Sequence, residues 1–220
     1  MSEKIIQSVE KFVKDEMEGL CAAHDFIHIE RVVSNAVKIQ KMEWAWDELT
    51  IIIGALLHES LDEKFFDNIE QRKKDIRVFL QTLGISDTQV EDVMFIIENV
   101  GFWKSLERDD SFEWSIEFQI VEDADRLEAI WAIAIGRMFS YGWKKRRPIY
   151  DPAIKAVPIT DKQHYYKNAD KSTSFNHFSE KLLLLKDMMH TESGKHIAEP
   201  RHRFMEIYME EFLAEWRGEK

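Results

Sequence analysis

The chain has 220 residues, of which 45% are hydrophobic, and this is enough for one domain with a sizeable core, with two small domains as the less favoured alternative. Its 41 acidic and 30 basic residues give a net charge of −11, which disfavours binding to nucleic acid or anionic membranes. The single cysteine, Cys21, excludes an intrachain disulfide and a zinc-thiolate cluster, and it fits a reducing cytoplasm. Residues 1–14 lack the apolar core of a secretory signal, and no segment approaches the roughly 20 apolar residues of a membrane span. We therefore expect a soluble, cytoplasmic protein.

Helical periodicity dominates the first part of the chain. Apolar residues recur at intervals of three and four along residues 3–83, which predicts an all-α fold. A first amphipathic helix is expected over residues 3–19, since Gly19 is a suitable stop. Asp25 can cap the second helix, which carries His28 near its start.

Side chains suited to helix caps mark the next three helices. Asp47 precedes residues 48–59, a segment so apolar that we expect it to be buried on most sides. Another helix is expected over residues 68–83. Ser86 and Gln89 have the spacing of a capping box and predict a helix that continues to about Glu98.

The second half of the chain is less regular. A long helical pattern runs over residues 111–141. Residues 144–174 contain three prolines and weak periodicity, which is typical of a loop that is either a lid or an ordinary surface excursion. Two final helices are expected over residues 175–190 and 193–216, and Pro200 can kink the last or begin a new one.

The stretch most suggestive of chemistry is residues 54–63, Gly-Ala-Leu-Leu-His-Glu-Ser-Leu-Asp-Glu. Here an apolar run ends in His58 and Glu59, and two more acids follow. Imidazole and carboxylate are ligands for divalent metals, and consecutive residues at a helix end can reach one point. The alternative is a helix that ends in polar residues as it leaves the core.

Two other apolar segments carry similar residues. Residues 24–32 read His-Asp-Phe-Ile-His-Ile-Glu-Arg-Val, and residues 121–127 read Val-Glu-Asp-Ala-Asp-Arg-Leu. Burying several unpaired polar groups is costly, so a shared partner for the three segments is favoured. We expect His28, His58 and Asp125 to converge.

These motifs resemble those of the HD-domain metal-dependent phosphohydrolase superfamily. His28 stands in His-x-x-Arg-Val, His58 precedes an acid, and Asp125 stands in Ala-Asp-Arg-Leu. The likeness is greater to small stand-alone bacterial members, which carry Ala-His-Asp-x-x-His-x-x-Arg-Val early and a Ser-Phe-Asn-His-Phe-like segment late. It extends from Cys21 to the C-terminus. The family's His-Asp doublet is here His58-Glu59.

The resemblance implies a single HD-type helical domain over residues 1–220. Its metal-site core is expected over residues 21–143. Residues 144–174 are then a lid over the site, and the C-terminal helices occupy residues 175–217.

The resemblance also implies a divalent metal ion, which is manganese, magnesium, cobalt, nickel or iron. Its ligands in this chain are His28, His58, Glu59 and Asp125. Because the glutamate is one methylene longer than aspartate, Glu59 can retain binding with altered metal preference, lie outside the metal's ligand shell, or weaken the site.

Further roles follow from matching positions in the family. Asp62 or Glu63 is the candidate base, with a solvated helix end as the alternative for both. The candidate substrate contacts are His24, Arg31, Arg126, His177 and Lys181. Capping of a helix is the alternative role for His24, and ion pairing is the alternative for the two arginines. Trp131 stands where similar proteins have a small residue and is expected to reshape the pocket.

The function implied is hydrolysis of a nucleotide or another small phosphorylated metabolite by metal-activated water. Cleavage of a nucleoside triphosphate to the monophosphate and pyrophosphate is one reaction of this class. The alternative is a degenerate HD domain that binds a nucleotide or protein partner without catalysis. A two-iron oxygenase is disfavoured, because no histidine lies between His58 and His164. A homodimer remains open.

Overall fold

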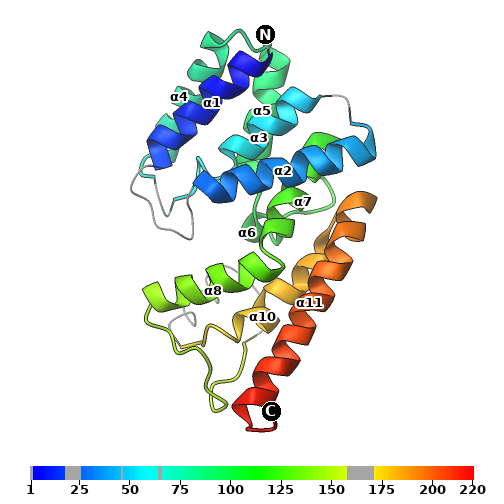
Figure 1. Cartoon of the computed structure of the whole chain (residues 1–220). Coiled ribbons are helices and arrows are strands. Elements are labelled where there is room, and N and C mark those ends of the chain that lie inside the picture. Colours follow the sequence, from blue (N-terminus) through cyan, green and yellow to red (C-terminus); the bar gives the residue numbers. More distant parts are fainter. Residues whose placement is uncertain (1, 18–25, 46, 64–65, 158–170) are drawn as a thin grey trace. The chain divides into compact units, whose positions relative to one another are not determined.

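The structure is a computed structural model, drawn in Figure 1. It describes residues 2–17, 26–45, 47–63, 66–157 and 171–220, which are helical or irregular and contain no strand. The predicted all-α class is therefore confirmed. The predictions for His24 and for an Asp25 cap fall outside the described residues. None of the described helices is long and apolar enough to cross a membrane.

The chain forms two compact units, residues 1–125 and 126–220, and each is described by itself. The first unit contains α1 (Ser2–Met17), α2 (Phe26–Glu43), α3 (Glu48–Leu57), α4 (Ile69–Thr82), α5 (Asp87–Asn99), α6 (Phe102–Ser105) and most of α7 (Ile116–Glu128). At its centre α3 packs against α1, α2 and α5. Residues 50–57 are all buried, as their apolar character predicts. The division into two units leaves the predicted domain boundaries a prediction.

The predicted caps form hydrogen bonds in the structure. Asp47 Oδ1 accepts from the backbone N–H of Thr50 at 3.0 Å, and Ser86 Oγ accepts from that of Gln89 at 3.3 Å. The predicted end of α3 at residue 59 is wrong by two residues. The helix ends at Leu57 because the N–H of Ser60 donates to its carbonyl at 2.8 Å in a tight turn.

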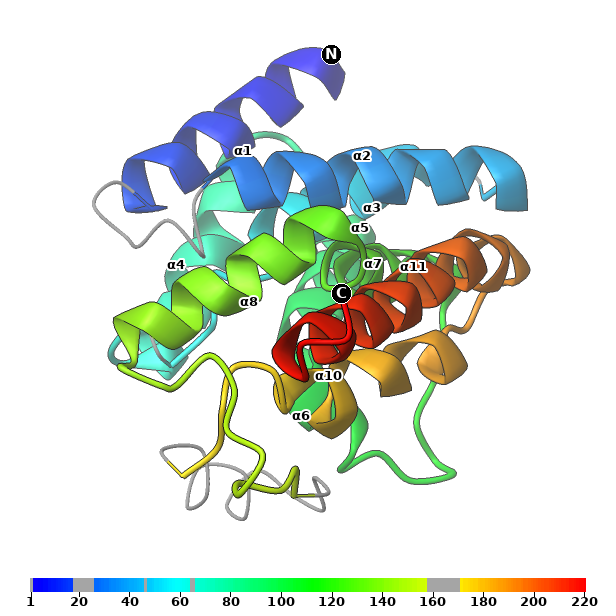
Figure 2. The ribbon, with the colours of Figure 1, turned by 60° about the horizontal axis from the view of Figure 1, so that its bottom comes forward.

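The second unit contains α8 (Ala132–Lys144), α10 (His177–Glu180), the 3₁₀-helix η1 (Leu182–Met188) and α11 (Glu192–Trp216). Figure 2 shows α10 and η1 beside α11. The single helix predicted over residues 175–190 is wrong, because the backbone of Lys181 leaves the helical region (φ −141°, ψ −55°). Pro200 lies within α11, which continues through it.

The single helix predicted over residues 111–141 is also wrong. α7 begins at Ile116 and ends at Glu128, and α8 begins at Ala132. Between them Trp131 adopts a φ of 115°, which no α-helix allows. Its indole stacks on Phe204 with ring centroids 5.5 Å apart, and this packing offsets the backbone strain.

Candidate metal centre

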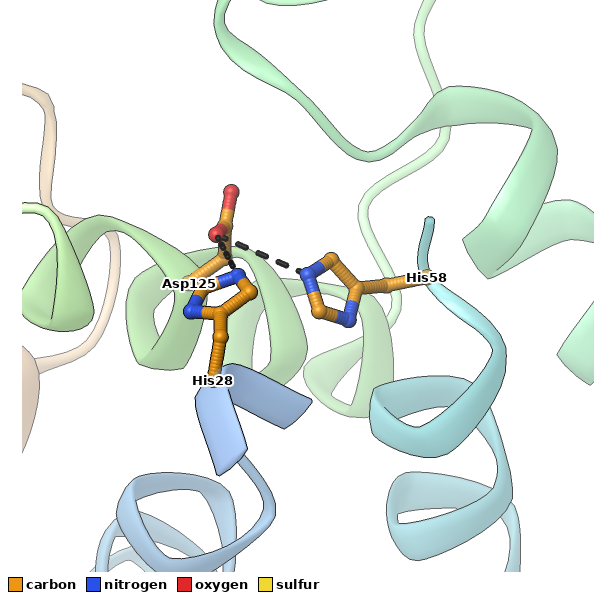
Figure 3. Close-up of side chains that lie close together, drawn as sticks. All are labelled: His28, His58 and Asp125. Atoms are coloured by element: carbon orange, nitrogen blue, oxygen red, sulfur yellow. Dashed lines mark ion pairs between the residues drawn. The ribbon is translucent and has the colours of Figure 1, made fainter. Parts of the chain in front are cut away.

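Three helices of the first unit bring His28, His58 and Asp125 together (Figure 3). His28 lies in the first turn of α2, His58 follows α3, and Asp125 lies on α7. One donor atom from each lies within 4.8 Å of the other two. Asp125 Oδ1 is 3.8 Å from His28 Nε2 and 3.7 Å from His58 Nε2. The predicted convergence of these three residues is present in the structure.

A hydrogen bond orients the ring of His58. Its Nδ1 lies 2.8 Å from the carbonyl oxygen of Ala55, so Nδ1 carries the proton and donates. The Nε2 lone pair is then directed toward Asp125. This Nε2 atom is buried and has no hydrogen-bond partner among the described residues. A buried acceptor in this state needs a further partner, and a metal ion fits that need.

The acids on α7 differ in their described contacts, and Asp125 is the one whose printed ion pairs are with the histidines. Glu122 is fully buried and accepts two hydrogen bonds from Arg108, at 2.6 and 2.7 Å. Asn35 Nδ2 donates to the carbonyl of Ala124 at 3.4 Å and so links α2 to α7 beside Asp125. Glu122 is therefore paired with Arg108 in the core, whereas Asp125 faces the two histidines.

Glu59 contributes a second carboxylate. Its Oε1 lies 3.6 Å from His28 Nε2, and 15% of its side chain is exposed. The longer side chain thus places an oxygen beside one of the two imidazoles. Two imidazoles and two carboxylates form a mixed nitrogen and oxygen donor set, which suits divalent transition metals.

Asp62 and Glu63 differ in their surroundings. Asp62 is half-buried and Glu63 is exposed. Lys104, on α6, donates to the carbonyl of Ile97 at 3.2 Å. Burial lowers the pKa of Lys104, while the negative charges of Asp62 and Glu98 act to raise it. The positive charge of Lys104 therefore lies near enough to Asp62 for the two groups to interact.

Sequence reasoning missed Lys104. It follows Gly101-Phe102-Trp103 in a short helix, with no spacing that relates it to the His58 segment. Only the three-dimensional fold brings it near Asp62.

The other predicted residues are distributed over both units. Arg31 lies half-buried on α2, one turn after His28. In the second unit, the Arg126 guanidinium donates to the carbonyl of Met188 and to His190 Nε2. His177 begins α10, and Lys181 follows its last residue.

Comparisons with known proteins identify the family. No family model matches the chain. Its sequence is 31% identical to Bacillus subtilis YpgQ over 204 residues, which cover 93% of this chain and 88% of that protein. The structure resembles that of an HD-superfamily hydrolase from Bacillus thuringiensis, with a TM-score of 0.77 and 35% identity over 99% of both chains.

A further match is the structure of Bacillus subtilis YpgQ in complex with ADP. Its TM-score is 0.72 and its identity 31%, with coverage of 94% of this chain and 95% of that one. The coverage is nearly complete in each case, so the likeness includes all three segments that carry His28, His58 and Asp125. The chain belongs to the HD superfamily of hydrolases.

Proposed function

We propose that this protein is a metal-dependent phosphohydrolase that acts on a nucleotide or another small phosphorylated molecule. The observation that carries the proposal is the convergence of His28, His58 and Asp125, with the buried His58 Nε2 directed into the group. The complex of YpgQ with ADP supports a nucleotide as the ligand class.

The residues that would hold the metal are His28, His58, Glu59 and Asp125. When bound, a divalent cation acidifies a coordinated water and polarises a phosphoryl oxygen. The carbonyl of Ala55 keeps the His58 ring in the tautomer whose Nε2 lone pair is available. The two carboxylates offset the cation's charge.

We propose that Asp62 accepts the proton of the attacking water. It is half-buried, three residues after Glu59, and its N–H donates to the Glu59 carbonyl at 3.1 Å. This backbone contact ties the position of Asp62 to that of the proposed ligand. Glu63 is exposed and is the second candidate.

Phosphate oxygens need cationic or donor groups, which an acidic chain must supply locally. Arg31, on the same helix as His28, is proposed for this role, and so are His177, Lys181 and His24. The contacts of Arg126 with Met188 and His190 favour a structural role for that side chain instead.

Three wider expectations stay predictions. They are a cytoplasmic location, a lid over residues 144–174, and a homodimer. Residues 158–170 of the expected lid lie outside the described part of the chain. Deleting residues 144–174 should change substrate affinity or rate if the lid operates during turnover.

The second candidate function is binding of a nucleotide without catalysis. The observation that favours it is Glu59, which stands where the family has aspartate. Metal content after purification separates the two candidates, since a phosphohydrolase needs metal near one equivalent per chain or more.

The experiment that tests the proposed function is a screen for phosphate and pyrophosphate release. Nucleoside mono-, di- and triphosphates and sugar phosphates are each supplied with manganese, magnesium, cobalt or nickel. We expect release from at least one nucleotide, and release that depends on the metal. No hydrolysis by metal-loaded protein, with tight nucleotide binding retained, would favour the second candidate.

A further inference from the structure

Two segments of the second unit are held side by side near the start of α10. The backbone N–H groups of residues 174 and 175 donate to the carbonyls of residues 148 and 149, each at 2.9 Å. Asn176 Nδ2 donates to the carbonyl of Ile154 at 3.1 Å. These bonds fix the chain just after Arg147 against the chain just before His177.

Close packing with α8 fixes the same region from the other side. Gly142 lies so near Ser174 that an added Cβ would be 1.9 Å from Ser174 Oγ. The N–H of Arg147 donates to the Gly142 carbonyl at 2.9 Å, so the chain turns tightly after α8. The backbone at Arg147 is therefore positioned by contacts on both sides.

Two basic side chains, those of Lys181 and Arg147, lie near enough to His177 to influence its pKa. The N–H of Lys181 donates to the His177 carbonyl at 3.0 Å, which places Lys181 one turn later. Burial, and then the charges of Lys181 and Arg147, lower the pKa of His177 to about 3. The ring is thus neutral at pH 7, and the positive charge near it comes from these two side chains.

The guanidinium of Arg147 has unused donor capacity. Its Nε is buried and has no hydrogen-bond partner in the described part of the chain. The guanidinium carbon lies 5.9 Å from the ring centroid of Tyr141. A buried N–H without an acceptor is unfavourable, so an anionic ligand that accepts from it gains affinity.

We propose that Arg147, Lys181 and the neutral His177 form an anion subsite that binds a phosphate group, with Arg147 Nε donating to a phosphate oxygen. A guanidinium and an ammonium match the double negative charge of a phosphate better than a single carboxylate. The inference rests on the proposed function in one respect, namely that the natural ligand carries a phosphate group. It adds Arg147, which the sequence motifs do not mark.

Calorimetric titration of inorganic pyrophosphate into chelator-treated full-length protein tests the subsite. Chelation removes any contribution from metal at His28, His58 and Asp125. We expect Arg147→Gln to weaken binding by about tenfold or more, the usual worth of a charge-assisted hydrogen bond. The matched control is Arg146→Gln, which removes the same charge from the exposed neighbouring residue and should retain the parent affinity.

An equal loss in both variants, unchanged binding in Arg147→Gln, or no binding by the parent would overturn the proposal. A second measurement does not depend on how the glutamine variant folds. In parent protein with isotope-labelled arginine, the Nε–H resonance of Arg147 should shift on addition of pyrophosphate, and that of Arg146 should not. Arg147→Lys assigns the signal, and an unmoved Arg147 resonance would contradict the assignment.

The same titration separates this inference from the proposed function. His58→Ala should lose hydrolysis and keep metal-free pyrophosphate binding. If the substrate screen instead detects no hydrolysis, the pyrophosphate titration still tests the subsite, because that titration involves no metal and no turnover.

Discussion

His58 Nε2 lies 3.7 Å from Asp125 Oδ1, and its Nδ1 donates to the carbonyl of Ala55 in the last turn of α3. The first contact joins α3 to α7, and the second fixes which nitrogen of the ring faces the site (Figure 3). A histidine held in this way acts as a ligand without a change of tautomer. The end of the buried helix α3 therefore sets both the position and the tautomer of the His58 ring.

Substitutions at Glu59 test whether the site works with a carboxylate side chain longer than that of aspartate. Glu59→Asp should alter the metal preference and keep or raise hydrolysis, because a shorter carboxylate moves the oxygen relative to His28. Glu59→Ala should weaken metal binding severely, since a ligand and its charge are lost together. Metal content by mass spectrometry measures both effects. Parent-like metal binding and turnover in Glu59→Ala would make Glu59 a bystander and would imply another acid, most simply Asp62 or Asp123.

Asp62 and Glu63 give a matched pair for the proposed base. Asp62→Asn should lower kcat by about a hundredfold or more, the usual contribution of a general base. Glu63→Gln should leave kcat close to the parent value, because Glu63 is exposed. Steady-state kinetics at saturating metal measures both. A larger loss in Glu63→Gln than in Asp62→Asn would reverse the assignment.

Much of the first unit follows from the sequence. The apolar run that became α3, and the caps at Asp47 and Ser86, have local signals that the structure confirms. His28, His58 and Asp125 could be paired in advance because each is a polar residue in an otherwise apolar helix. Each of these residues lies on the buried part of its segment, which leaves few ways to satisfy such groups except through one another.

The features that were missed depend on contacts distant in sequence. The break between α7 and α8 contains no glycine or proline, and the ring of Trp131, the residue with positive φ, packs on Phe204, which is distant in sequence. Glu122 resembles Asp125 in sequence, yet Arg108 pairs with it in the core. No periodicity within one segment indicates which acid a distant arginine will contact.

His177 should make stability depend on pH. Its pKa is about 3 in the folded state and 6.5 in an ordinary environment, so between these values the unfolded chain binds more protons. The free energy of unfolding therefore falls as the pH drops through this range, by at most about 2 kcal/mol at pH 5 from this group. His177→Gln should flatten the fall measured by urea denaturation at pH 7 and pH 5. The exposed His196→Gln is the control, and parallel curves for parent and His177→Gln would exclude the effect.

Replacing either of two glycines of α8 with alanine is expected to change the stability of the protein, in opposite directions at the two positions. Gly142→Ala should destabilise the protein by about 1 to 3 kcal/mol, because the new methyl overlaps Ser174. Gly136→Ala meets nothing within 4 Å and should stabilise by up to about 1 kcal/mol through helix propensity. Urea midpoints measure both, and equal effects would contradict the close packing of α8 on Ser174.

The central claim is that His28, His58 and Asp125 hold a metal on which hydrolysis depends. The most direct measurement is phosphate or pyrophosphate release by chelator-treated protein, before and after manganese is added back. We predict that the parent and the exposed-site control His196→Ala regain activity with metal, and that His58→Ala and Asp125→Asn do not. Hydrolysis by the metal-free parent, or full recovery in His58→Ala, would contradict the claim.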